Sequence, residues 1–178
     1  MDASIIKTGM TLGWGMLDDD ARAYLELEKI SATGNTRFQW PRPGGKLVIE
    51  LEARDDHRDR FFLDIGECRR TATIAVGLLP ERKSKMQTRS ADRPLIRIDY
   101  ASDPDMLVHT NPDGKVIVGS HMHIDVDNPN RMSWAFPLDH QTILSPDTDI
   151  GSVAGIFFAF MDACHIDKSI SVEQLLGV

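Results

Sequence analysis

The feature that most constrains the fold is a series of short apolar segments between residues 46 and 138, separated by residues typical of turns. Lys46–Ala53 alternates between apolar and polar side chains, so that Leu47, Ile49 and Leu51 share one face of a β-strand. Further strands are expected at Arg60–Ile65, Thr71–Leu79, Lys85–Ser90, Pro94–Tyr100, Lys115–Val118, His121–Val126 and Met132–Leu138. Because the connections are short, we expect neighbouring strands to pair antiparallel.

One helical pattern precedes these strands and another follows them. Ala21–Ala32 follows three aspartates, which can cap a helix, and Gly34 stops it. Ile150–His165 carries a broad apolar stripe, which predicts a largely buried helix. This order predicts an α+β fold with an N-terminal helix, a curved antiparallel sheet of about five to seven strands and a buried C-terminal helix. With both helices on one face, the other face of the sheet is free to hold a site.

The composition is that of an ordinary soluble protein with one domain: 178 residues, 42% hydrophobic and 26% charged. We expect residues 17–178 to form this domain and the glycine-rich residues 1–16 to be loosely ordered. No apolar run approaches the roughly 20 residues that span a bilayer, and the N-terminus does not resemble a signal peptide. The two cysteines, Cys68 and Cys164, lack Cys-x-x-Cys spacing, which favours a reduced, cytoplasmic location.

Charge is distributed unevenly along the chain. Residues 69–97 carry eight basic and two acidic side chains, a net charge of +6, and this leaves −13 on the rest of a chain whose total is −7. Such a basic segment can bind a phosphate backbone, which makes RNA a candidate partner. The alternative is a solvated loop and strand edge, because lysine and arginine also protect strand edges from aggregation.

Four of the six histidines, His109, His121, His123 and His140, lie close together in the sequence. His121, His123 and Asp125 would share one face of a strand, while the apolar residues between them face the core. His109 precedes the turn Asn111–Gly114, whose proline and glycine are typical of a tight reversal. Histidine transfers protons near neutral pH and is also a common metal ligand. The pattern therefore predicts a functional site in this region without deciding its chemistry.

The leading hypothesis is a small endoribonuclease that needs no metal and no cofactor. Attack by a 2′-hydroxyl requires a base, an acid for the leaving oxygen, and cations for the charge that develops on the phosphate. The residues assigned to these roles are His109, His121 and His123 as acid and base, and Arg89, Arg97, Lys85, Gln87 and Trp134 as substrate-binding side chains.

Two alternatives remain open. The His-x-His pair with His109 or Asp125 as third ligand could hold zinc in a metal-dependent hydrolase. The scattered carboxylates, Asp64 and Asp99 among them, rank lower as a nuclease site. In the other alternative the histidines are structural, and the acidic remainder binds a protein partner by imitating nucleic acid. That partner would be a toxin, or a host defence complex that a phage protein inhibits. Nothing in the sequence indicates an oligomeric state.

Several motifs resemble one family. They are Phe62-Leu63-Asp64-Ile65, Leu95-Ile96-Arg97-Ile98-Asp99, His109-Thr110-Asn111-Pro112-Asp113-Gly114, His121-Met122-His123-Ile124, Trp134-Ala135-Phe136-Pro137-Leu138 and a closing Cys164. From about Lys46 to Ile166 the chain resembles an uncharacterised family of small bacterial and phage proteins, a domain of unknown function. The family pattern has tyrosine at Asp125, which weakens Asp125 as a metal ligand, and the first forty residues fit the pattern poorly.

That family is distantly similar to the small ribonuclease toxins of toxin–antitoxin pairs, which combine a helix with a curved antiparallel sheet. The similarity implies a toxin-like or phage-encoded ribonuclease, but it is an analogy at the level of the fold. The family itself implies no activity.

Overall fold

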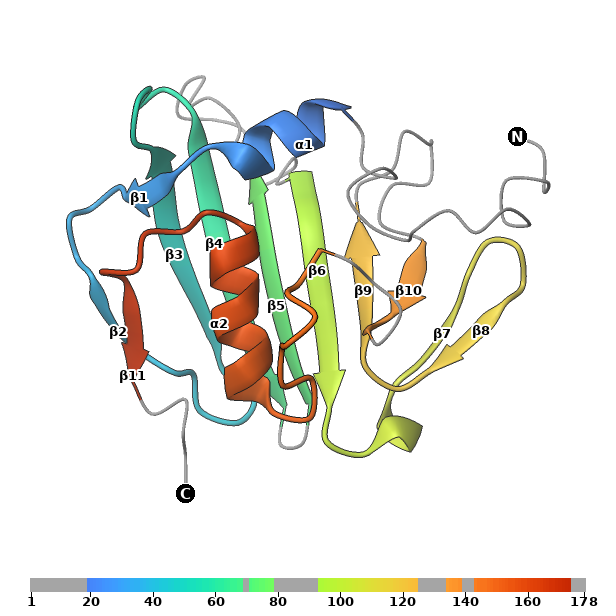
Figure 1. Ribbon diagram of the computed structural model, residues 1–178. Helices are drawn as coiled ribbons and strands as arrows, with labels where there is room; N and C mark the ends of the chain where they lie inside the picture. Colours follow the sequence, from blue (N-terminus) through green and yellow to red (C-terminus); the bar gives the residue numbers. More distant parts are fainter. Residues whose placement is uncertain (1–18, 69–70, 79–92, 125–133, 139–142, 174–178) are drawn as a thin grey trace, which may run out of the picture.

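The computed structural model describes residues 19–68, 71–78, 93–124, 134–138 and 143–173. The expected loosely ordered segment 1–16 and the expected strand Lys85–Ser90 lie outside the described residues, as does most of the basic segment 69–97. Figure 1 shows a large sheet with one long helix across it and a shorter helix at one end. The predicted α+β fold with helices near both ends of the described chain is confirmed.

The main sheet has seven strands in the order β1-β3-β4-β5-β6-β9-β10, and every neighbouring pair is antiparallel. These strands are β1 (Lys29–Ser31), β3 (Lys46–Ala53), β4 (Arg60–Cys68), β5 (Thr71–Leu78), β6 (Arg93–Ala101), β9 (His121–Ile124) and β10 (Ala135–Pro137). The remaining elements are α1 (Asp19–Glu26), β2 (Arg37–Gln39), the 3-10 turn η3 (Pro104–Met106), β7 (Val108–Thr110), β8 (Val116–Val118), α2 (Val153–Ala163) and β11 (Ser171–Glu173). β7 and β8 form a separate two-stranded hairpin, and β2 pairs with β11 in parallel.

The register of the sheet separates an apolar face from a polar one. One row of paired residues runs Leu47, Ile65, Ile74, Ile98, Met122 and Phe136 from β3 to β10. All six belong to the core or pack against it, together with Phe157 and Phe160 of α2. The adjacent row on the opposite face runs Lys46, Gly66, Thr73, Asp99, His121 and Pro137. The period-2 pattern of the sequence thus places the helices on one face and the polar side chains on the other.

Lys29 ends the first helix earlier than the sequence pattern predicts. The expected helix Ala21–Ala32 stops at Glu26, because Lys29 begins β1 and pairs with Ala53 of β3. The Lys29 side chain is fully buried, and its Nζ donates to the carbonyl oxygens of Leu25 (3.0 Å), Leu27 (2.8 Å) and Cys164 (2.9 Å). These carbonyls lie at the C-terminal ends of α1 and α2, where the helix dipole favours a cation.

Backbone dipoles stabilise the charge of Lys29, and no acidic side chain among the described residues forms an ion pair with it. Burial lowers the pKa of Lys29 to about 8, so the amine is mostly protonated at pH 7. Burial also raises the pKa of the Cys164 thiol to about 12, which keeps that neighbour neutral. The Nζ atom lies 4.9 Å from the centroid of the Phe61 ring, a cation–π contact within the core.

The second helix is also shorter than expected, Val153–Ala163 in place of Ile150–His165. Ser152 is its N-cap and accepts a hydrogen bond from the Gly155 amide. Ile156, Phe157, Phe160 and Met161 are buried, which confirms the expected buried helix. Among the helices of the described residues, none combines the length and the apolar character needed to cross a membrane.

Candidate metal centre

His121 and His123 lie side by side on the polar face of the sheet, at the β6–β9 pairing. His121 is paired with Asp99 and His123 with Arg97 across the two strands. Met122 and Ile124, which alternate with them, belong to the core. Both imidazoles are buried, with 3% and 1% of their residue surface exposed. The predicted common face of His121 and His123 is therefore present, but the two rings are less accessible than side chains that line an open cleft.

His109 joins this pair from a different part of the chain. It lies on β7 and is half-buried, and its ring centroid is 4.7 Å from that of His123 and 5.5 Å from that of His121. One ligand nitrogen from each of the three rings lies within 4.8 Å of the others. We call His109, His121 and His123 the histidine cluster. Three imidazoles gathered in this way are a candidate site for a metal ion.

The β7–β8 hairpin that carries His109 is closed by the predicted turn. The Gly114 amide donates to the Asn111 carbonyl at 2.8 Å, and the Asn111 amide donates to the Lys115 carbonyl at 2.9 Å. Gly114 has a φ of 83°, a conformation that glycine adopts without steric cost. His109 is paired with Ile117, which is buried, so this side of the hairpin faces the sheet.

Asn111 attaches the hairpin to the edge of the main sheet. Its Nδ2 donates to the Ala135 carbonyl at 3.0 Å, and its Oδ1 accepts from the Ala135 amide at 2.8 Å. The Asn111 side chain is buried. Its amide group donates one hydrogen bond to the Ala135 backbone and accepts another, as the backbone of a neighbouring strand would. Ala135 is the β10 partner of His123. Asn111 therefore sets the position of the hairpin next to the ring that His109 contacts.

Replacing Asn111 by aspartate is expected to loosen the hairpin. A carboxylate still accepts from the Ala135 amide, but it cannot donate to the Ala135 carbonyl and repels it. We expect a loss of about 1–3 kcal/mol in the free energy of unfolding and faster hydrogen exchange of the Ala135 amide. Urea denaturation and exchange measured by NMR test this. Asn35→Asp is the control, because Asn35 is exposed and its side-chain Oδ1 accepts a hydrogen bond from the Arg37 amide, which an aspartate can also accept. Unchanged stability and exchange in Asn111→Asp would contradict the role of Asn111.

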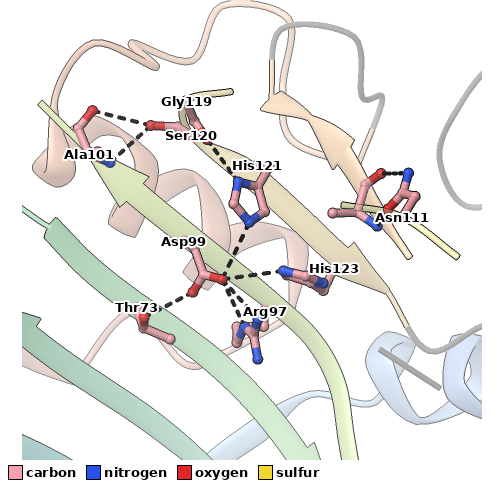
Figure 2. A network of polar contacts seen from close by, with 10 residues as sticks. Thr73, Arg97, Asp99, Ala101, Asn111, Gly119, Ser120, His121 and His123 are labelled. Carbon is pink, nitrogen blue, oxygen red and sulfur yellow. Dashed lines mark hydrogen bonds and ion pairs between the residues drawn. The ribbon is translucent and has the colours of Figure 1, made fainter. Parts of the chain in front are cut away.

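Asp99 lies at the centre of the polar contacts. Its Oδ1 accepts from Thr73 Oγ1 at 2.9 Å, and its Oδ2 accepts from Arg97 Nη2 at 2.9 Å and Nε at 3.1 Å. The same Oδ2 lies 3.3 Å from His123 Nε2 and 3.6 Å from His121 Nε2 (Figure 2). Burial raises the pKa of Asp99, but the contact with His123, the charge of Arg97 and the Thr73 hydrogen bond together lower it to about 2. Asp99 is therefore a carboxylate at any physiological pH.

The hydrogen bond of His121 determines which ring nitrogen carries its proton. Nδ1 lies 2.7 Å from the carbonyl oxygen of Gly119. Because a carbonyl oxygen only accepts, Nδ1 must donate, and a neutral ring then has its lone pair on Nε2. Burial lowers the pKa of His121, and the Gly119 hydrogen bond offsets this only in part. His121 is therefore neutral at pH 7, and its Nε2 is available to bind a cation.

Some of the other residues expected at the site are described by the structure, and others are not. Arg97 lies on the polar face next to the histidine cluster, and Trp134 is half-buried directly before β10. From the sequence alone Asp99 ranked low, as one of several scattered carboxylates, but its side chain contacts both His121 and His123. The expected substrate-binding residues Lys85, Gln87 and Arg89 and the expected third ligand Asp125 lie outside the described residues.

Comparison with known proteins places the chain in a family. Residues 16–166 match a family described as a family of unknown function (DUF6978). The chain belongs to this family. The DUF6978 match begins at residue 16, 30 residues before Lys46, so the expectation that the first forty residues fit the family poorly is wrong for residues 16–40. Neither the curated proteins nor the solved structures contain a match to this chain.

Family membership confirms the expected resemblance to an uncharacterised family. The family has no known function, so membership assigns no chemistry to the histidines. The resemblance to phage proteins and ribonuclease toxins stays a prediction, as does the cytoplasmic location.

Proposed function

We propose that this protein is a metal-dependent hydrolase with the histidine cluster at its catalytic centre. The observation that carries the proposal is the convergence of three imidazoles from β7 and β9, with ligand nitrogens within 4.8 Å of one another. His121 is held in the tautomer that leaves Nε2 without a proton. Three imidazoles in one place suit zinc and related divalent ions.

The burial of the histidines favours metal binding over direct proton transfer to RNA. A general base has to come within hydrogen-bond distance of the hydroxyl that it deprotonates. His121 and His123 are 3% and 1% exposed, which leaves little surface for a substrate to contact. A metal ligand needs no such access, because the ion and its bound water meet the substrate. Zinc in hydrolases lowers the pKa of bound water to about 7 and so supplies a nucleophile at neutral pH.

We propose a phosphodiester as the substrate class, with RNA as the first substrate to test. Arg97 supports this choice, because it is the cross-strand partner of His123 and its side chain is 37% exposed. A guanidinium has five N–H donors, more than the contact with Asp99 takes up, and its fork matches two phosphate oxygens. Arg97, the last basic residue of the segment 69–97, is thus on the same face of the sheet as His121 and His123.

The test combines metal analysis with a cleavage assay. Protein purified without chelator should contain about one equivalent of zinc or bind it when it is added, and it should cleave labelled RNA or a chromogenic phosphodiester. Activity should disappear with EDTA and return when zinc is added in excess. Cleavage that survives EDTA would overturn metal dependence and favour the histidine acid–base ribonuclease. Zinc binding without turnover of either substrate would contradict the hydrolase and favour a binding protein.

A further inference from the structure

The contacts of Asp99 differ from those of an ordinary ion pair. One oxygen, Oδ2, faces Nε2 of both His121 and His123, at 3.6 and 3.3 Å. The other oxygen is held by Thr73, and Arg97 donates to Oδ2 from the side (Figure 2). The side chain of Asp99 is 14% exposed, so water has little access to it. Three potential ligand atoms from β6 and β9 therefore converge in a buried place.

The tautomer of His121 makes this convergence unfavourable without a cation. Because Nδ1 donates to Gly119, Nε2 of a neutral ring presents its lone pair to the carboxylate oxygen. Two atoms that only accept repel each other, and a positive ion between them turns that repulsion into attraction. A proton on Nε2 would also join the two atoms, and measurements of metal binding distinguish a proton from a metal ion at this position.

The distances match those between ligands of one ion. Zinc binds imidazole nitrogen at about 2.0–2.1 Å and carboxylate oxygen at about 2.0–2.2 Å, in tetrahedral geometry. Two ligand atoms at the corners of such a tetrahedron are then roughly 3.4 Å apart. The separations of 3.3 and 3.6 Å between Asp99 Oδ2 and the two Nε2 atoms lie on either side of this value. Each histidine nitrogen therefore lies at the distance from Asp99 Oδ2 that two ligands of one zinc ion would have.

We propose that His121, His123 and Asp99 are the fixed ligands of the metal and that His109 faces its open coordination position. The assignment rests on the metal centre proposed above and changes the ligand set. The fixed ligands all belong to two adjacent strands of the main sheet, whereas His109 belongs to a separate hairpin and is more exposed. Thr73 and Arg97 orient the carboxylate, as partners of metal-bound carboxylates commonly do.

This arrangement gives His109 a role of its own. A ring at the open position can accept a proton from a water bound there or donate one to a leaving group. The substrate then approaches from the side of the β7–β8 hairpin, past Arg97. A centre with three fixed ligands and one open position is typical of catalytic zinc, whereas four protein ligands are typical of structural zinc.

The experiment compares Asp99→Asn, His109→Asn and the control Asp64→Asn. Asp64 lies on the same face of the sheet and is ion-paired with Lys46, so its loss reports on surface charge alone. Zinc affinity is measured by competition with a chromophoric chelator, and the ligand geometry is measured from the visible spectrum of the Co²⁺ form. We expect Asp99→Asn to weaken zinc binding at least about 100-fold. We expect His109→Asn to weaken it less than about 10-fold while removing hydrolysis.

Two results would overturn the assignment. One is that His109→Asn no longer binds zinc while Asp99→Asn still binds it. The centre would then consist of three histidines, and Asp99 would be a positioning residue. If Asp99→Asn does not fold, Asp99→Ser replaces it, and an unchanged Co²⁺ spectrum in that variant, which has no carboxylate, would show that Asp99 is not a ligand. Wild-type protein that binds neither zinc nor Co²⁺ would contradict the metal centre itself. Failure of the metal centre can therefore be distinguished from failure of the ligand assignment.

Discussion

Replacing His121 and His123 together by alanine is expected to abolish zinc binding, with a loss of at least about 10³-fold in affinity. Both rings are buried and carry two of the three proposed fixed ligands. Asp99 and His109 remain in the variant, but neither can replace two imidazoles in a place that water hardly reaches. Hydrolysis of RNA or of the chromogenic substrate should fall to background, because the ion that would bind the nucleophilic water is lost.

The double variant needs a measure of its fold and a matched control. Circular dichroism and urea denaturation report whether loss of the two rings from the polar face disturbs the sheet. His57→Ala is the control, because His57 lies in a turn, its side chain is 67% exposed, and its contact is with Glu52 away from the cluster. A folded double variant with zinc affinity within tenfold of wild type would show that these histidines are structural.

Replacing Lys29 by methionine is expected to cost about 3–5 kcal/mol of unfolding free energy, a large part of the stability of a domain of this size. Methionine has a similar length and fills the buried space, but it donates no hydrogen bond. The carbonyls of Leu25, Leu27 and Cys164 would then lose the donor that they share. Two helix C-termini would also lose the cation that complements their dipoles.

Urea denaturation of Lys29→Met and of Lys115→Met measures this cost. Lys115 is exposed on the hairpin turn, so the control removes the same charge without removing a buried donor. We expect the control to change stability by less than about 0.5 kcal/mol. A loss below about 1 kcal/mol in Lys29→Met would mean that water or backbone movement satisfies the carbonyls equally well.

Local patterns predicted the interior of the fold better than its edges. β3 occupies Lys46–Ala53 as predicted, because alternation and a clear turn on each side specify both its face and its ends. The short strands β1, β2, β7 and β11, of three residues each, were not predicted. They are stabilised by pairing with distant segments, such as β2 with β11, and a segment of three residues has too little pattern of its own to reveal that.

Local patterns also predicted only part of the site. The alternation of His121 and His123 with apolar residues was enough to place both rings on the polar face. It could not identify the neighbouring strand, because the β7–β8 hairpin separates β9 from β6 in the sequence. Only the pairing of β6 with β9 brings Asp99 to His121. Without that pairing Asp99 is one carboxylate among many.

The contacts of Lys29 also set a condition on when the chain can complete its fold. The hydrogen bond from Lys29 to Cys164 joins residues 135 positions apart, and the Lys29 amide donates to the more distant His165 carbonyl. At a synthesis rate of about 5–20 residues per second, these partners emerge on the order of ten seconds after Lys29. Until then α1 and β1 lack the acceptors supplied by the end of α2. The first described helix is thus among the last parts of the domain to become stable on the ribosome.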